Sequence, residues 1–316
     1  MRIAVIDMGT NTFHLLVAKV DNGQFETIYR EKSAVKIGAK GINDGLITEA
    51  AQTRALKTLR RFKQITEVEN VDQVFATATS AIRNANNGAD LVAKIKEETG
   101  ISTRIISGEE EAKLIYYGVE HALDLGDETS LIMDIGGGSI EFIIGNENEI
   151  KWKHSFEIGG QRMIERFHKH DPIRTEEKEA VEAYLDEHLT LLFEKVTQYQ
   201  PTALIGSSGT FDTLSDIYRV KEGLEKSPEA TEFPLTLSGF NEIFADILVK
   251  TREERLAMPG MIELRVEMIV VASILIDFIL TRSQIKKIRV SAYALKEGVL
   301  LNTIHQLTKQ ASVSKA

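Results

Sequence analysis

Residues 4–11 read AVIDMGTN and residues 131–139 read LIMDIGGGS, so the chain carries the same short pattern twice. Each copy is an apolar run that ends in an aspartate, and a glycine lies two positions further on. Glycine lets the backbone turn sharply and direct its N–H groups at one point, as an anion-binding turn does. A second apolar run follows each copy, at residues 13–20 and 140–144, so both copies predict buried β-hairpins. We expect residues 34–37 to add a third strand to the first hairpin.

The length and the repeated pattern favour two lobes. With 316 residues and 43% apolar content, the chain can bury a substantial core and exceeds the usual size of one domain. Each half holds one hairpin, so we expect homologous lobes that face each other and clamp a phosphate between their turns. The polar stretch at residues 124–127 marks the boundary, which gives a first lobe at 1–124 and a second lobe at 125–298.

Composition excludes several classes of function. The net charge of −9 argues against non-specific binding to nucleic acids or anionic membranes. The longest apolar stretch, residues 266–281, is too short for a comfortable membrane span and contains Glu267 and Asp277, which favours a buried helix. No signal-peptide pattern precedes the first strand, so we expect a cytoplasmic protein. The chain has no cysteine, which excludes disulfides and thiolate chemistry.

Three acids are candidate ligands for a divalent cation: Asp7, Asp134 and Glu141. The first two end the apolar runs and the third lies on the strand that follows, and carboxylate oxygens suit Mg²⁺ bound directly or through waters. The alternative is that these acids only cap turns, or that Glu141 is an exposed strand residue. The predicted donors to phosphate oxygens in the two turns are Thr10, Asn11, Gly136, Gly137 and Ser139.

Glu111 is the candidate general base. It follows a capping-box spacing in which Ser107 is the N-cap and Glu110 reaches back, while Glu109 favours the positive end of the helix dipole. Glu111 has Ile, Gly and Ala at i+4, i+7 and i+11, so the helical period places it on the apolar face. Partial burial raises the pKa of a carboxylate, which suits a base that activates water. The alternative is an ordinary charge at a helix end.

Several other residues are candidates for phosphate contacts. Arg83 follows a run of small residues at 77–82, where a guanidinium can bind phosphate with two hydrogen bonds; the alternative is a surface arginine. A third glycine loop at residues 206–210 is either another anion site or a helix start. The remaining candidates are Lys36 and Arg162, each near a glycine, and Ser208 and Gly209 of the third loop.

Taken in order, these segments resemble the exopolyphosphatase and guanosine pentaphosphate phosphohydrolase (Ppx/GppA) family, and the resemblance spans nearly the whole chain. It implies an α/β fold with two ribonuclease-H-like lobes of the actin-like ATPase superfamily around an interlobe cleft. It also implies that a C-terminal helix at about residues 299–316 packs back on the first lobe. The chain resembles a short form without the C-terminal helical domain of longer relatives.

The resemblance implies hydrolysis of the terminal phosphoanhydride of inorganic polyphosphate with Mg²⁺ or another divalent cation. It places Glu111 on the catalytic base, Arg83 on a substrate-phosphate contact, and Asp134 and Glu141 on residues needed for activity or magnesium. Guanosine pentaphosphate stays open as the second possible substrate. An ATP-dependent kinase and a non-catalytic phosphate sensor of the same superfamily stay open as competing functions. The oligomeric state is open too, with a homodimer as one option.

Overall fold

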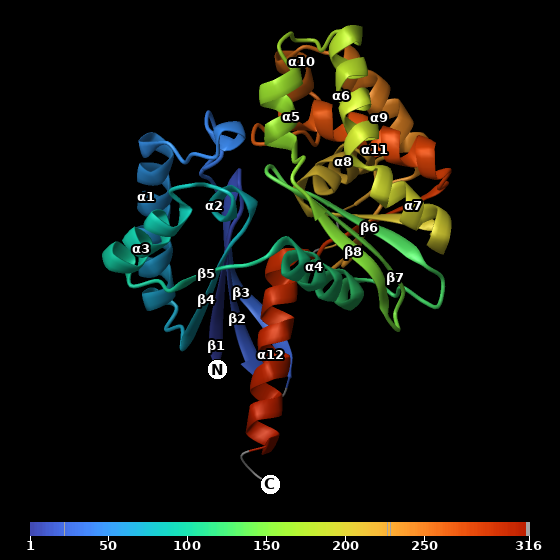
Figure 1. Ribbon diagram of the computed structural model, residues 1–316. Coiled ribbons are helices and arrows are strands. Elements are labelled where there is room, and N and C mark those ends of the chain that lie inside the picture. Colours follow the sequence, from blue (N-terminus) through green and yellow to red (C-terminus); the bar gives the residue numbers. More distant parts are fainter. Residues whose placement is uncertain (22, 226, 228, 314–316) are drawn as a thin grey trace. The chain divides into compact units, whose positions relative to one another are not determined.

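The computed structural model describes residues 1–21, 23–225, 227 and 229–313, with side chains described as far as Lys309 (Figure 1). The chain divides into two compact units, of which the first is Met1–Gly118 with Leu295–Ala316 and the second is Val119–Ala294. The last part of the predicted C-terminal helix, residues 314–316, lies outside the described residues. Among the helices of the described part, none is long and apolar enough to span a membrane.

The first unit contains a five-stranded sheet with the order β3-β2-β1-β4-β5. Its strands are β1 (Arg2–Met8), β2 (Thr12–Asp21), β3 (Gln24–Ala34), β4 (Gln73–Ala78) and β5 (Thr103–Ile105). The first three strands pair antiparallel, and β1, β4 and β5 pair parallel. The first predicted hairpin is therefore confirmed.

The predicted third strand at residues 34–37 is wrong, because β3 spans Gln24–Ala34 and ends where that prediction begins. Every second residue of this edge strand is exposed, so its apolar signal is weak. The backbone N–H groups of Lys36 and Gly38 instead donate to the carbonyls of Asn11 and Thr10, at 2.9 and 3.2 Å. The segment after β3 thus packs on the turn between β1 and β2.

Helices pack on the first sheet. They are η1 (Ile42–Asp44), α1 (Glu49–Val68), α2 (Ser80–Arg83), α3 (Gly88–Thr99), α4 (Gly108–Ala122) and α12 (Leu295–Val313). Alternate residues of β1, such as Ile6 and Met8, form one core with Leu59 and Phe62 of α1. A Cβ added to Gly298 would lie 1.7 Å from the carbonyl oxygen of Leu114, so only glycine allows α12 to lie this close to α4 (Figure 1).

The second unit repeats this sheet order and adds one strand, giving β10-β11-β9-β6-β7-β8. Its strands are β6 (Ser130–Ile135), β7 (Ile140–Gly145), β8 (Ile150–Phe156), β9 (Ala203–Ser207), β10 (Glu232–Phe233) and β11 (Lys287–Ser291). Strands β6, β7 and β8 pair antiparallel, and β6, β9 and β11 pair parallel, as the corresponding strands do in the first unit. The second hairpin and the predicted α/β class with two related sheets are confirmed.

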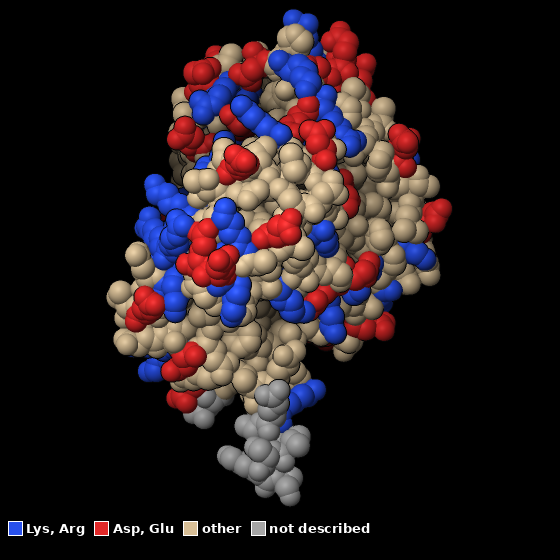
Figure 2. All heavy atoms as spheres, turned by 60° about the vertical axis from the view of Figure 1, so that its left-hand side comes forward, with Lys and Arg blue, Asp and Glu red and all other residues tan. Residues whose placement is uncertain are grey.

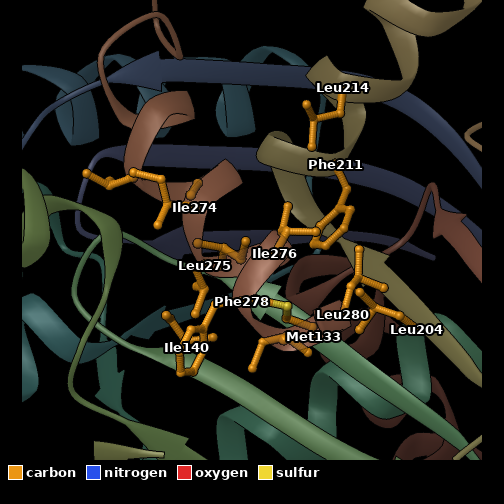
Figure 3. Close-up of a cluster of buried hydrophobic side chains, with 14 of the residues drawn as sticks. Met133, Ile140, Leu204, Phe211, Leu214, Ile274, Leu275, Ile276, Phe278 and Leu280 are labelled. Carbon is orange, nitrogen blue, oxygen red and sulfur yellow. The ribbon is translucent and has the colours of Figure 1, made fainter. Parts of the chain in front are cut away.

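The core of the second unit surrounds one helix. The helices of this unit are α5 (Gly160–Phe167), α6 (Thr175–His188), α7 (Thr190–Tyr199), α8 (Ser208–Lys221), α9 (Leu237–Val249), α10 (Arg252–Leu256) and α11 (Met268–Ser283). Helix α11 is buried along nearly its whole length, which confirms the buried helix predicted there. Figure 3 shows Ile276 of α11 among Phe211 of α8, Met133 of β6 and Leu204 of β9.

The carboxylate of Glu177, in the first turn of helix α6, binds backbone N–H groups of the loop before that helix. Oε1 of Glu177 accepts from the backbone N–H of Lys169 at 2.9 Å and lies 3.0 Å from Nδ1 of His170, and Oε2 accepts from the backbone N–H of Arg174 at 2.9 Å. Burial raises the pKa of Glu177, but these bonds outweigh it and hold the pKa at about 2. The ionised carboxylate therefore stabilises the folded loop before α6.

This shift predicts a pH-dependent cost of the substitution Glu177→Gln. Because the folded pKa is depressed, the stabilisation is fully present above the unfolded pKa of about 4.5 and disappears as pH falls toward 2. We expect the variant to lose about 1–2 kcal/mol of unfolding free energy at pH 7 and less than half of that near pH 3. Urea unfolding at both pH values measures this, with Glu176→Gln in the same turn as control. A deficit that does not change with pH would contradict the assignment.

Candidate functional site

In the first unit, polar side chains form a row across all five strands. Asp7 of β1 lies opposite His14 of β2 and beside Thr77 of β4. The row continues to Lys32 of β3 and Arg104 of β5. Residues directly opposite on neighbouring strands point to the same face of a sheet, so these side chains share one face. The row thus holds a histidine, a threonine and two basic residues beside Asp7, and no second acid.

The second unit has the corresponding row, with different chemistry. Asp134 of β6 lies opposite Glu141 of β7, with Ser155 of β8 beyond Glu141 and Ser207 of β9 beyond Asp134. Oγ of Ser207 donates to Oδ2 of Asp134, and Oγ of Ser155 donates to Oε1 of Glu141, both at 2.7 Å. Asp134 is 7% exposed and Glu141 is 1% exposed, so Glu141 is not the exposed strand residue that the sequence left as an alternative.

The two glycine turns are built alike. In residues 136–138, all three glycine carbonyls accept backbone N–H groups from the start of α5, from Gly159, Gly160 and Gln161, at 2.8–3.1 Å. In the first turn, the carbonyls of Thr10 and Asn11 are bound in the same way by the segment after β3. In a trans peptide the N–H points away from the carbonyl, so both turns present N–H groups on the side opposite these bonds. This arrangement can bind an anion.

Arg162 supports the second turn. Its Nε donates to the carbonyl of Gly138 at 2.8 Å, and its Nη2 lies 3.4 Å from the carboxylate of Glu157. The residue is 9% exposed. Its described contacts thus hold the glycine turn in place, whereas the sequence suggested a phosphate contact.

Lys36, by contrast, is exposed and lies beside the first turn. Its φ is 48°, in the left-handed region that is uncommon for a residue with a side chain. Arg54 of α1 fixes this backbone, because its Nε and Nη2 donate to the carbonyls of Val35 and Lys36 at 2.7 and 2.9 Å. The strained conformation is thus held by an arginine and by the bond to Asn11.

Glu111 and Arg83 form a largely buried ion pair in the first unit. Nη1 of Arg83 lies 2.9 Å from Oε2 of Glu111 and 3.1 Å from the carbonyl oxygen of Ile106. Glu111 is 6% exposed, which confirms the prediction that it lies on the buried face of its helix. The side chain of Arg83 is 15% exposed, so it is not an ordinary surface arginine.

The predicted capping box before α4 is half correct. Oγ of Ser107 accepts from the backbone N–H of Glu110 at 3.1 Å, as expected of an N-cap. The carboxylate of Glu110 instead pairs with Nη1 of Arg104 at 2.6 Å. Glu110 therefore pairs with Arg104 of β5 and not with the backbone N–H at the start of its own helix, as the local spacing predicts.

Gly209 of the third glycine loop lies against a buried arginine. Ser208 has a φ of 66°, and a Cβ added to Gly209 would lie 2.1 Å from Nη2 of Arg265. Arg265 is 6% exposed. Burial lowers the pKa of its guanidinium, whereas the negative charges of Asp212 and Asp134 act to raise it. An arginine stays protonated in proteins, so this charge lies beside Asp134. A larger residue at position 209 would have to displace this guanidinium.

Two residues of these sites, Ser155 and Arg265, were not expected from the sequence, and Ser207 was given no role in the predicted third loop. The pairing of β8 with β7 identifies Ser155, and it is not visible in the chain itself. Arg265 precedes α11 and is brought to the third loop only by the fold of the second unit. Ser207 lies in the third glycine loop, residues 206–210, directly before the predicted Ser208.

The acid pair of the second unit fits a magnesium ion. Within the described residues, no group of three or more His, Cys, Asp or Glu side chains is arranged to hold a metal. Mg²⁺ typically uses one or two carboxylates and completes its shell with waters and substrate phosphates. Asp134 and Glu141, adjacent and buried, offer such a pair of hard oxygen donors. Asp7, the third predicted ligand, lies in the first unit.

Basic and acidic side chains are mixed on the face of the molecule in Figure 2, where Lys and Arg are interspersed with Asp and Glu. The chain as a whole has 38 basic and 47 acidic residues. A phosphate chain therefore needs local donors, and the glycine turns supply N–H groups for that purpose.

The sheets and these sites define an α/β protein with the actin-like fold, in which two units share one sheet order. The model of the Ppx/GppA phosphatase family matches residues 16–307, and the chain belongs to this family. It is similar to an exopolyphosphatase from Cytophaga hutchinsonii, with 48% sequence identity, a TM-score of 0.94, and coverage of 97% of this chain and 98% of that one.

Two further solved structures share the fold. An exopolyphosphatase-like protein is 25% identical with a TM-score of 0.87, and a Ppx/GppA family member from Aquifex aeolicus is 24% identical with a TM-score of 0.79. In both comparisons, 97% of this chain and 98% of the other are covered. The fold is thus shared along nearly the whole chain.

Proposed function

We propose that the protein is an exopolyphosphatase, which hydrolyses the terminal phosphoanhydride of inorganic polyphosphate and releases orthophosphate. The observation that carries the proposal is the 48% identity, over 97% of the chain, to a protein named as an exopolyphosphatase. The buried Glu111–Arg83 pair supports hydrolysis, because a carboxylate held by an arginine can orient a water and accept its proton.

Each group has a role in this proposal. Asp134 and Glu141 would hold Mg²⁺, with Asp7 as a further candidate; magnesium supplies positive charge that offsets the charge of the reacting phosphoryl group. Arg83 orients Glu111 and adds positive charge beside it. Glu111 orients and deprotonates the attacking water. The proposed phosphate donors are Thr10, Asn11, Gly136, Gly137, Ser139, Ser208 and Gly209, with Lys36 as a cationic contact.

Arg162 differs from the other predicted phosphate contacts, since its described bonds go to Gly138 and Glu157. Through the carbonyl of Gly138, Arg162 acts on phosphate by fixing the turn. Lys36 is exposed at the edge of the first turn and suits a direct contact. The two basic residues therefore have different proposed roles.

Guanosine pentaphosphate is the second candidate substrate, because the resemblance to the Ppx/GppA family, whose model matches residues 16–307, leaves it open. Both substrates end in the same phosphoanhydride, so the reacting groups do not discriminate between them. The measurement that decides is kcat/KM for each substrate, with Mg²⁺ and without any acceptor. We expect orthophosphate from both and a kcat/KM about 10-fold or more higher for polyphosphate.

The same assay distinguishes a hydrolase from a kinase and from a sensor. A higher kcat/KM for guanosine pentaphosphate would replace the polyphosphate assignment. A kinase would release no phosphate until ATP and an acceptor were supplied. A sensor would show ligand-induced thermal stabilisation with no product over hours.

A further inference from the structure

The acid pair of the second unit lies between two hydroxyl donors. Ser155 donates to Glu141 from β8 and Ser207 donates to Asp134 from β9, so the order across four strands is hydroxyl, acid, acid, hydroxyl. Both bonds are 2.7 Å long, typical of a hydroxyl bound to a charged oxygen. Ser207 is completely buried, which leaves its hydroxyl little freedom to bind elsewhere.

This arrangement addresses a specific electrostatic problem. Two carboxylates directly opposite each other in a sheet repel, and burial increases the cost of each charge. A hydroxyl on the far side of each acid lowers that cost and fixes the side-chain rotamer. Each serine binds one oxygen of its carboxylate, Oε1 of Glu141 or Oδ2 of Asp134, and so sets the direction in which the other oxygen points.

The first unit provides an internal comparison. In its equivalent row, Lys32 takes the place of Ser155, His14 that of Glu141, and Thr77 that of Ser207. The hydroxyl of Thr77 lies 3.4 Å from the backbone carbonyl of Ile6. The flanking pair of carboxylate-bound serines thus accompanies the paired acids and is no general feature of the sheet.

We propose that Ser155 and Ser207 are positioning residues that hold Glu141 and Asp134 as paired ligands of a divalent cation. The proposal rests on the proposed function in one respect, that these acids bind Mg²⁺. The serines do not touch substrate; they act through the carboxylates. Their removal should therefore weaken cation binding more than it slows turnover once the cation is saturating.

The test compares Mg²⁺ binding by calorimetry, without substrate, in the wild type, Ser155→Ala, Ser207→Ala and Ser155→Thr. Residues that orient metal ligands typically contribute 10–100-fold in affinity, so we expect each alanine variant to bind Mg²⁺ about 10-fold or more weakly. Thr at position 155 retains the hydroxyl and should restore affinity to within about 3-fold. The Mg²⁺ concentration that half-saturates turnover should rise in parallel, while kcat at saturating Mg²⁺ changes far less.

Ser130→Ala is the matched control. Ser130 is also buried and lies on β6, the strand of Asp134, but it belongs to another level of the sheet. Its replacement should leave Mg²⁺ affinity within about 2-fold, and thermal unfolding verifies that all variants fold. Equal affinity in the wild type and both alanine variants, or a wild type that does not bind Mg²⁺, would overturn the positioning role. A wild type that releases no phosphate from polyphosphate overturns the proposed function instead, so the two failures are distinguishable.

Discussion

Replacing Glu111 with Gln is expected to lower kcat for phosphate release from polyphosphate by about 10²–10⁴, the usual contribution of a general base. Gln has nearly the same shape and retains an oxygen that Nη1 of Arg83 can bind at the present 2.9 Å. It cannot accept the proton of the attacking water. The loss should therefore appear in kcat, with KM for polyphosphate changed much less, because the amide leaves the phosphate-binding turns intact.

Glu110→Gln is the control for this experiment. Glu110 is in the same helical turn and also pairs with an arginine, Arg104, but its side chain is 35% exposed. It should retain kcat within about 2-fold, as most surface substitutions do. Because Glu111→Gln leaves Arg83 beside a neutral partner, the variant can also be destabilised. Circular dichroism shows whether it is folded, and so whether the loss of kcat comes from the missing base. A folded Glu111→Gln enzyme that works within a few-fold of the wild type would refute the assignment.

The sequence predicts best what depends on short stretches of chain. The two hairpins follow from apolar runs around an aspartate and a glycine, and both strand pairs form as expected. The burial of Glu111 follows from the helical period, because Ile115, Gly118 and Ala122 on its face are buried as well. In each case the deciding neighbours lie within one element or one turn.

The predictions that failed are those in which the partner of a residue comes from a distant part of the chain. The acid of Glu110 pairs with Arg104 of β5 rather than with its own helix end. Residues 34–37 look apolar enough for a strand, yet Lys36 binds the carbonyl of Asn11 in the first turn. A side chain's partner across the sheet depends on strand register, which local periodicity does not reveal.

The serines show the same limit within the candidate site. Ser155 lies 14 residues after Glu141, and nothing in the spacing marks it as a partner. Only the pairing of β7 with β8 brings the two together. A sequence therefore reveals the acids of such a site more readily than the hydroxyl groups that orient them.

Replacing Arg255 with Met is expected to cost the second unit about 2–4 kcal/mol of unfolding free energy, because the buried guanidinium makes three hydrogen bonds and an acceptor left without its donor costs about 1–3 kcal/mol. Arg255 is 1% exposed and donates to the carboxylate of Asp171 at 2.8 Å and to the carbonyls of Lys250 and Val266 at 2.6 and 3.1 Å. Met fills a similar volume but satisfies none of these acceptors. The backbone oxygens would remain buried without their donor, which is why the cost exceeds that of an exposed pair.

The loop that Arg255 holds also carries its own charges. Burial raises the pKa of Asp171, but bonds from the Arg252 backbone N–H and from the Arg255 guanidinium outweigh this and lower it. Burial, with the charge of Arg255, lowers the pKa of His168 in the same loop. Arg255→Met removes the side-chain partner of Asp171 and the donor to two backbone carbonyls. Asp171→Asn should cost less, because Arg255 then still donates to both carbonyls.

Urea unfolding followed by tryptophan fluorescence measures this cost in the correct unit, because the chain has one tryptophan, Trp152, on β8 of the same unit. In a unit of this size each kcal/mol lowers Tm by about 2–4 °C. Lys221→Met is the matched control: Lys221 pairs with Glu242 on the surface of the same unit, and an exposed pair contributes little to stability. If Arg255→Met unfolded at the same urea concentration as the wild type and the control, the hydrogen bonds of Arg255 would not be what attaches the loop before α6 to helix α10.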